Sequence, residues 1–174
     1  MIDNWFDREN ALEKNDELSN FLKYWLEHKP FQPPFDSNAV NITENNVIAT
    51  VLYRNDNFQV QLVTVRPNTE IIDHVHPNVD SFEVYLSGEI AFRRNQKKIT
   101  GKKFWREHNK TCAYFGYFIR VNSNDWHGAT IGNMGGSFLS VQHWKNGANP
   151  SSVHWDWEYK DKTETTRTKR LVNS

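Results

Sequence analysis

The sequence predicts an all-β domain, an antiparallel sandwich or barrel, preceded by one α-helix. Three observations support this class. Seven or more short segments are rich in β-branched and aromatic residues; Asn, Gly, Pro and Asp separate them; and no helical pattern lies between them. At 174 residues the chain is long enough for one hydrophobic core. Its seven Trp, six Tyr and eleven Phe suit a β-rich core or a pocket with flat walls.

The helix is predicted between Asp16 and Lys29, where Pro30 blocks continuation. Its apolar residues recur at helical spacing: Leu18, Phe21, Leu22, Trp25 and Leu26. This stripe is too small to form a core alone, so residues 1–30 are expected to be a helical segment packed on the outside of the barrel.

The rest of the chain divides into a connector, a β domain and a tail. "PFQPPFDSN" carries three prolines in five residues, so residues 31–46 are expected to be an extended connector. Residues 47–158 are expected to form the β domain. Residues 159–174 are charged and poor in apolar side chains, which predicts a tail that is frayed or laid along the surface.

The strands of the β domain are predicted from alternation and β-propensity. The segments are "VIATVLY", "FQVQLVTV", "EIIDHVH", "SFEVYLS", "EIAFRR", "CAYFGYFIRV" and "SFLSVQHW". In the last of them, either Ser140 and Gln142 or Val141 and His143 face inward, and alternation alone does not choose between the two.

Charge and cysteine content exclude several classes of protein. Lys plus Arg balance Asp plus Glu at 21 each, so no overall field favours nucleic acid or an anionic membrane. Cys112 is the one cysteine, which excludes an internal disulfide and a Cys-rich zinc site. The N-terminal residues lack the layout of a secretory signal, and no apolar run could span a bilayer. We expect a cytoplasmic protein with no nucleic-acid or membrane partner.

Two histidines one residue apart, His74 and His76, are the first candidate functional residues. Residues i and i+2 of a strand point to the same face, so both imidazoles can reach one metal ion. A pair of histidines on a solvated strand face would show the same spacing, so the wider pattern has to carry the interpretation.

That wider pattern resembles the cupin superfamily from about Val47 to Trp144. The spacing of the first cupin motif is matched by Asn68, His74, His76, Ser81 and Gly88, with Asn replacing the initial glycine and Ser replacing the glutamate. The spacing of the second is matched by Gly116, Asn122, Asn124 and His127, with Asn at the usual Pro and Gly positions and Ile131 at the usual terminal Asn. Asn tolerates positive φ, so the turns at Asn68 and Asn124 can be kept.

The resemblance implies a double-stranded β-helix, or jelly roll, with a divalent metal inside the barrel. The implied ligands are His74, His76 and His127. Fe(II) is the favoured ion, with Mn, Ni or Zn as alternatives.

Ser81 stands where the family usually has its carboxylate ligand, and serine is a poor ligand for a divalent ion. Glu83 lies two residues further on and on the same strand face. It can replace the family's carboxylate, either as a metal ligand or as a general base acting through water. A bare triad of histidines, resembling the thiol dioxygenases among cupins, is another alternative. Asp80 is a third, if a bulge turns it inward. Tyr85 shares the face of Glu83 and is a candidate catalytic residue lining the pocket.

Three functions remain open from the sequence. The first is a metal-dependent enzyme that acts on a small molecule. It is either a mononuclear Fe(II) oxygenase, which is a dioxygenase-like oxidoreductase, or a metal-assisted lyase or isomerase. The second is a barrel that binds a small ligand without turnover, which loss of the glutamate ligand favours. The third is a metal-free cupin resembling sugar epimerases or isomerases, which needs a catalytic His and Tyr. A homodimer is left open.

Overall fold

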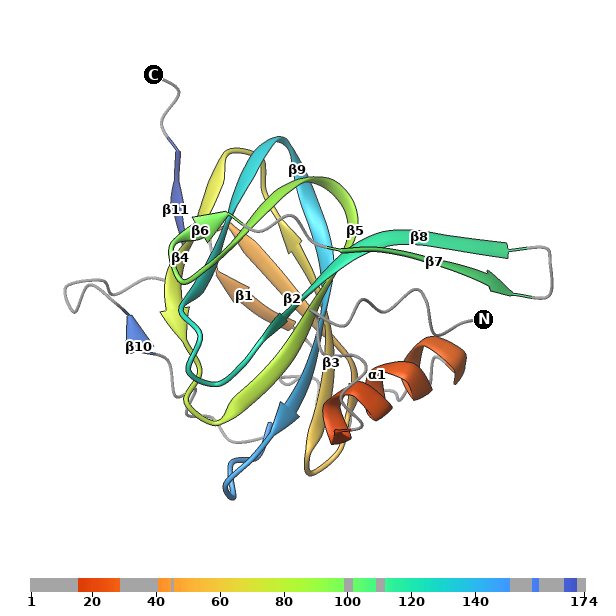
Figure 1. Ribbon diagram of the computed structural model, residues 1–174. Coiled ribbons are helices and arrows are strands. Elements are labelled where there is room, and N and C mark those ends of the chain that lie inside the picture. The colour runs from red at the N-terminus through yellow and green to blue at the C-terminus, as the bar shows by residue number, and fades with distance from the viewer. Residues whose placement is uncertain are drawn as a thin grey trace.

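The computed structural model describes residues 16–28, 41–44, 46–98, 102–108, 112–150, 158–159 and 168–171. These residues form one helix, α1 (Glu17–His28), and a set of strands (Figure 1). The strands are β1 (Asn41–Glu44), β2 (Val47–Arg54), β3 (Phe58–Val65), β4 (Thr69–Val75), β5 (Val79–Arg94), β6 (Lys97–Lys98), β7 (Lys102–His108), β8 (Cys112–Val121), β9 (His127–Trp144), β10 (Glu158–Tyr159) and β11 (Thr168–Arg170).

The strands form an all-β, antiparallel double-stranded β-helix, as predicted. Hydrogen-bonded neighbours follow the order β1-β2-β3-β9-β5-β8-β7, and β4 pairs with the first part of β9 and with β10 and β11. Figure 1 shows these strands wrapped around one interior, with the β7–β8 hairpin extending beyond the barrel. The end of β4 and the start of β5 are joined by residues 76–78 alone, so they lie at the same end of the barrel.

β5 and β9 each run through both sheets of the barrel. The first part of β5 pairs with β8 and with the second part of β9, whereas its second part pairs with the first part of β9. At the corner, Gly88 has a φ of 84°, and a Cβ there would lie 2.2 Å from the carbonyl oxygen of Gly135. Only glycine allows this approach. The sequence reads "SFEVYLS" and "EIAFRR" as separate strands, and the structure joins them through bulges.

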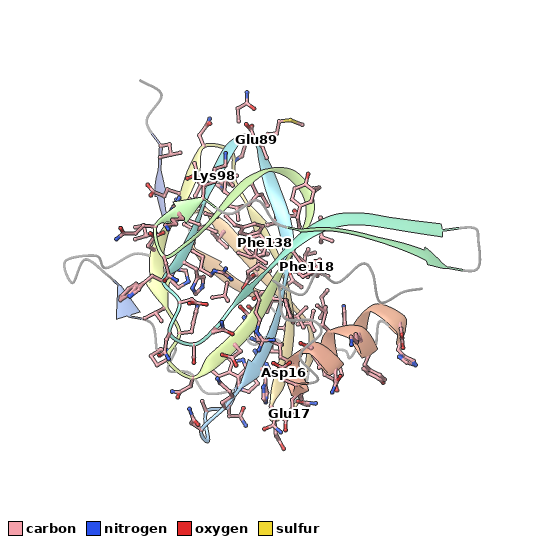
Figure 2. All side chains as sticks on the ribbon, viewed as in Figure 1. Asp16, Glu17, Glu89, Lys98, Phe118 and Phe138 are labelled. Carbon is pink, nitrogen blue, oxygen red and sulfur yellow. The ribbon has the colours of Figure 1, made fainter. Side chains whose placement is uncertain are left out.

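Two apolar clusters lie on opposite sides of the central sheet. The cluster inside the barrel contains Ala49, Val63, Val65, Phe92, Ile119, Val121, Ala129, Ile131 and Phe138. The cluster between the sheet and α1 contains Leu18, Phe21, Leu22, Trp25, Val60, Phe82, Val84, Phe118 and Val141. Strand alternation produces this division, because neighbouring residues point to opposite faces. In Figure 2, Phe138 of the inner cluster and Phe118 of the outer cluster are labelled.

The predicted helix is present and docks by its apolar face. Asp16 caps it: one carboxylate oxygen accepts a hydrogen bond from the Ser19 amide at 2.8 Å, and the other lies 2.7 Å from the Arg120 guanidinium on β8. Figure 2 shows Asp16 and Glu17 at the start of this helix. Within the described residues, no helix is long and apolar enough to cross a membrane.

Five strands, β1, β6, β7, β10 and β11, fall where the sequence suggests none. β1 lies inside the expected connector 31–46 and pairs with β2, so the sheet begins before residue 47. β11 lies inside the expected tail 159–174 and pairs with β4. β7, built from the polar stretch "KKFWREH", pairs with β8. Pairing with an existing strand edge, rather than local apolar pattern, creates these strands.

The docking of α1 can be tested at Leu22, which is fully buried in the outer cluster. Leu22→Ala should lower the free energy of unfolding by about 2–5 kcal/mol, because it leaves a cavity between helix and sheet. Glu27→Ala, on the exposed face of the same helix, is the matched control and should change it by less than about 0.5 kcal/mol. Chemical denaturation measures both; equal effects would contradict a docked helix.

Candidate metal centre

The three predicted histidines meet inside one end of the barrel. His74 is the last-but-one residue of β4, and His127 is the first residue of β9; the two are direct cross-strand partners. His127 shares its strand face with Ala129 and Ile131 of the inner cluster, so it points inward. His76 follows β4 by one residue. Pairing of β4 with β9 therefore brings together two motifs that lie fifty residues apart.

The imidazole rings are close enough to share one ion. Their centroids are 4.9 Å apart for His74 and His76, 4.3 Å for His74 and His127, and 5.3 Å for His76 and His127. One ring nitrogen from each residue lies within 4.8 Å of the others. No carboxylate belongs to this group in the part of the chain that the structure describes.

Backbone carbonyls fix two of the rings in the orientation that a metal requires. Nδ1 of His74 lies 2.6 Å from the carbonyl oxygen of Ile72, and Nδ1 of His127 lies 2.9 Å from that of Asp125. A carbonyl only accepts, so each Nδ1 carries the proton and each Nε2 keeps its lone pair. Second partners of this kind typically orient metal-binding histidines.

The electrostatics of His127 also suit a ligand. Burial lowers the pKa of His127 below its ordinary value; the Asp125 carbonyl and the charges of Asp125 and Asp73 oppose that effect without reversing it. The ring is therefore neutral near pH 7, and only a neutral imidazole can donate its lone pair. Three imidazole nitrogens are a donor set that fits a first-row divalent ion such as Fe(II), Mn(II), Ni(II) or Zn(II).

The motif residues also occupy the turns that their spacing predicts. Asn68, before β4, has a φ of 51°, and Gly88 forms the corner of β5. Asn124 does not adopt a positive φ. The two-sheet topology, the corner glycine and the inward histidines are all present in this chain. The chain has the fold of a cupin.

Solved structures of cupin barrels are similar to this chain. An RmlC-like cupin from Shewanella frigidimarina is 12% identical, with a TM-score of 0.48 over 67% of this chain and 95% of that chain. KdgF from Halomonas sp. is 12% identical, with a TM-score of 0.47 over 69% and 91%. An oxalate decarboxylase mutant from Bacillus subtilis is 19% identical, with a TM-score of 0.43 over 69% of this chain and 29% of that chain. No family model matches the sequence, and no curated protein matches it.

Glu83 is buried inside the barrel, as predicted, but lies outside the histidine group. Its Oε1 accepts hydrogen bonds from the hydroxyls of Ser81 at 2.7 Å and Ser140 at 3.2 Å, whereas its Oε2 has no hydrogen-bond partner. Burial raises the pKa of Glu83 to about 7, although both serines act to lower it. Direct ligation of a metal by Glu83 stays a prediction.

The other two predicted oxygen donors are engaged elsewhere. Asp80 faces away from the interior: its carboxylate accepts hydrogen bonds from the Lys145 ammonium at 2.8 Å and the Ser123 amide at 2.9 Å. No bulge turns it inward, so Asp80 as a ligand is wrong. The hydroxyl of Tyr85 donates to the carbonyl oxygen of Gly88 at 2.8 Å, beside the inner apolar cluster, and a catalytic role for it stays a prediction.

The structure decides the orientation of the last predicted strand. Ser140 and Gln142 face the interior, whereas His143 stacks on Phe58 and lies 3.0 Å from the Glu17 carboxylate on the α1 side.

Sequence reasoning missed several interior polar groups. Gln59 and Gln61 of β3 are buried inside the barrel, and Arg94 of β5 is the cross-strand partner of His127. Alternation was the available signal, because "FQVQLVTV" places both glutamines on one face, and "EIAFRR" places Arg94 on the face of Ile90 and Phe92.

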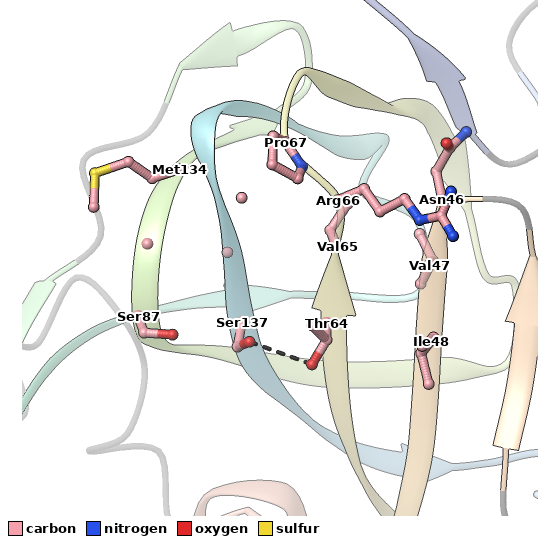
Figure 3. Close-up of a pocket in the computed structure, with 13 residues that line it drawn as sticks. Asn46, Val47, Ile48, Thr64, Val65, Arg66, Pro67, Ser87, Met134 and Ser137 are labelled. Atoms are coloured by element: carbon pink, nitrogen blue, oxygen red, sulfur yellow. Dashed lines mark hydrogen bonds between the residues drawn. The ribbon is translucent and has the colours of Figure 1, made fainter.

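A separate hollow of about 520 Å³ lies at the other end of β4 (Figure 3). Its wall includes Arg66, Pro67 and Met134, and its base carries a hydrogen bond between the hydroxyls of Thr64 and Ser137. It contains no histidine or carboxylate, so it lacks the donors of a transition-metal site.

Replacing His74, His76 or His127 by Ala should each remove most of the bound metal while leaving the β-rich circular dichroism spectrum largely intact. Each variant loses one of the three imidazole donors. His143→Ala, which changes a histidine on the α1 side, is the matched control and should keep its metal. Elemental analysis of freshly purified protein measures the difference, and full retention in all three variants would exclude the site.

The buried carboxyl of Glu83 should make the metal-free protein less stable as pH rises. The folded-state pKa is about 7, above the ordinary 4.5, so the folded state holds a proton that the unfolded state releases. The contribution of this proton to the free energy of unfolding is fully present below about pH 4.5 and is lost as pH rises through 7. Glu83→Gln lacks this titration. Its free energy of unfolding should therefore rise relative to that of the parent by up to about 3 kcal/mol between pH 5 and pH 8. Denaturant unfolding of both proteins at both pH values tests this. A difference in free energy of unfolding between Glu83→Gln and the parent that does not change with pH contradicts it.

Proposed function

We propose that the protein is a mononuclear metal enzyme that acts on a small molecule inside the barrel. The observation that carries this proposal is the group of three inward histidines, two of which have Nδ1 held by a backbone carbonyl. Such a triad leaves coordination positions open, which is typical of catalytic rather than structural sites. A bound Fe(II), the favoured ion, would supply Lewis acidity and, with dioxygen, redox chemistry.

The chain's own contribution to chemistry comes from Glu83. A carboxyl group with a pKa near 7 is half-protonated at neutral pH, so it can take a proton from a substrate or return one. Its unpartnered Oε2 is the atom that carries this proton. Ser81 and Ser140 hold Oε1 from two sides and so fix the direction in which Oε2 points.

This arrangement supports two reaction types. An oxygenase uses the open positions for substrate and dioxygen, whereas a lyase or isomerase needs the ion only as a Lewis acid and depends on Glu83 for proton transfer. The placement of Glu83 outside the histidine group supports its role in proton transfer.

A small-ligand-binding barrel without turnover is the second candidate. The observation in its favour is that no described carboxylate completes the metal group. The two functions are separated by turnover in the metal-loaded protein.

The experiment loads metal-free protein with Fe(II), Mn(II), Ni(II) or Zn(II) and assays small thiols and small organic acids by oxygen consumption and by product analysis. Glu83→Gln should keep its metal and lose at least about 100-fold in turnover, since a positioned acid or base contributes about that much. Weaker metal binding in this variant would instead make Glu83 a ligand. No turnover with any loaded ion would favour the binding protein.

A further inference from the structure

We propose that a ladder of buried polar side chains on β3, β9 and β5 is a recognition site for hydroxylated small molecules, with Gln61 and Glu83 as the two groups that contact the substrate hydroxyl. This inference deepens the proposed function by naming a substrate class, and so rests on it. The ladder consists of Gln59, Gln61, Gln142, Ser140, Ser81 and Glu83.

The orientation of the first two amides is fixed by groups that only donate hydrogen bonds. Nε of Arg54 donates to Oε1 of Gln59 at 2.6 Å, which leaves Nε2 of Gln59 to donate to Oε1 of Gln142 at 3.0 Å. The indole N–H of Trp144 also donates to that Gln142 oxygen at 3.0 Å. Arg and Trp side chains have no acceptor in these contacts, so neither amide can flip without losing them.

The same donor-to-acceptor direction of the hydrogen bonds continues to Gln61. Nε2 of Gln142 has two protons and donates hydrogen bonds to Oε1 of Gln61 at 3.3 Å and to the hydroxyl oxygen of Ser140 at 3.0 Å. Because Oε1 of Gln61 is the acceptor, its Nε2 must present two N–H donors, and that nitrogen is buried without a partner. The Ser140 hydroxyl accepts a hydrogen bond from Gln142 and donates one to Oε1 of Glu83.

The ladder thus ends at two unsatisfied polar atoms on either side of Ser140. Gln61 and Glu83 are both cross-strand partners of Ser140, one from β3 and one from β5. They are only 4% and 7% exposed, and Nε2 of Gln61 and Oε2 of Glu83 are the buried side-chain polar atoms without a partner in the described part of the chain. Native proteins rarely leave such groups unpaired, at a cost of about 1–3 kcal/mol each, unless a ligand or water completes them.

The chemistry of the two atoms selects the ligand. Gln61 supplies donors only, so it requires an oxygen lone pair; Oε2 of an ionised Glu83 requires a donated proton. A hydroxyl group offers both, and neighbouring hydroxyls of a polyol, sugar or hydroxy acid can meet the two atoms together. A purely apolar substrate would leave both atoms buried and unpaired.

The ladder and the histidines lie at the same end of the interior. Ser81 and Glu83 lie near the start of β5, three and five residues after residue 78, and Ser81 is the partner of Val121 at the end of β8, just before the loop to His127. The opposite end of the interior is apolar, with Ile131, Val63 and Phe138. A substrate bound at the metal would therefore meet the polar wall.

The test uses three-carbon acids with two, one and no hydroxyl groups: glycerate, lactate and propionate. Titration calorimetry on metal-loaded protein should show the affinity order glycerate, lactate, propionate. Gln61→Leu removes the donor at similar volume and should cut the preference for glycerate over propionate by roughly 3- to 10-fold, the worth of one hydrogen bond. A hydroxyl that binds only the metal would keep its full preference in this variant, so an unchanged preference overturns the proposal, as does no preference in the parent.

Two further variants keep the experiment decisive. Gln61→Glu retains an acceptor for Gln142 but has no N–H, so if Gln61→Leu does not fold, Gln61→Glu should lose the preference in its place. Thr64→Val, on the same strand but facing outward, is the matched control and should keep it.

The outcome separates this inference from the proposed function. Metal content and turnover are measured on the same samples, and the titrations are repeated after chelation. A protein that binds metal but shows no preference for hydroxylated acids overturns the proposed recognition site and does not contradict the proposed metal enzyme. A Gln61-dependent hydroxyl preference that persists in a protein that never binds metal supports the ladder and overturns the enzyme.

Discussion

The pairing of β5 with β9 is the constraint on which the rest of the barrel depends. It continues from Val79 opposite Trp144 to Arg94 opposite His127, through a corner where Gly88 and the Gly135 carbonyl approach more closely than any side chain allows. Because both strands bend there, one strand pair belongs to both sheets and closes the interior. The start of β9 is thereby set against β4, and the two histidine motifs meet.

Polarity divides the interior that this pairing encloses. Histidines, glutamines, serines and Glu83 lie toward the end near the turn between β4 and β5, whereas Val63, Ile131 and Phe138 of the inner apolar cluster lie toward the other end. Burial of so many polar groups is costly unless they bind one another or a ligand. Most of them do bind one another, and the exceptions mark where a substrate is expected.

The outer face of the same sheet has a different role. Phe82, Val84 and Val141 alternate with the interior polar residues and pack against α1, and Arg120 binds the helix cap at Asp16. In the first part of β5 and the last part of β9, residues that pack against α1 therefore alternate with residues that form the polar interior. A one-residue slip in register would exchange the two sets, so packing of α1 also protects the register of the polar ladder.

The all-β class, the helix between Asp16 and Lys29 and the three histidines were predicted from local patterns, because periodicity and motif spacing are properties of short stretches of chain. Tertiary structure decided the rest. Whether Ser140 or His143 faces inward, and whether Asp80 turns toward the metal, depends on register between strands distant in sequence. The hydrogen-bond direction that leaves Gln61 unpaired depends on Arg54 and Trp144, about ninety residues apart, and no local pattern encodes such a contact.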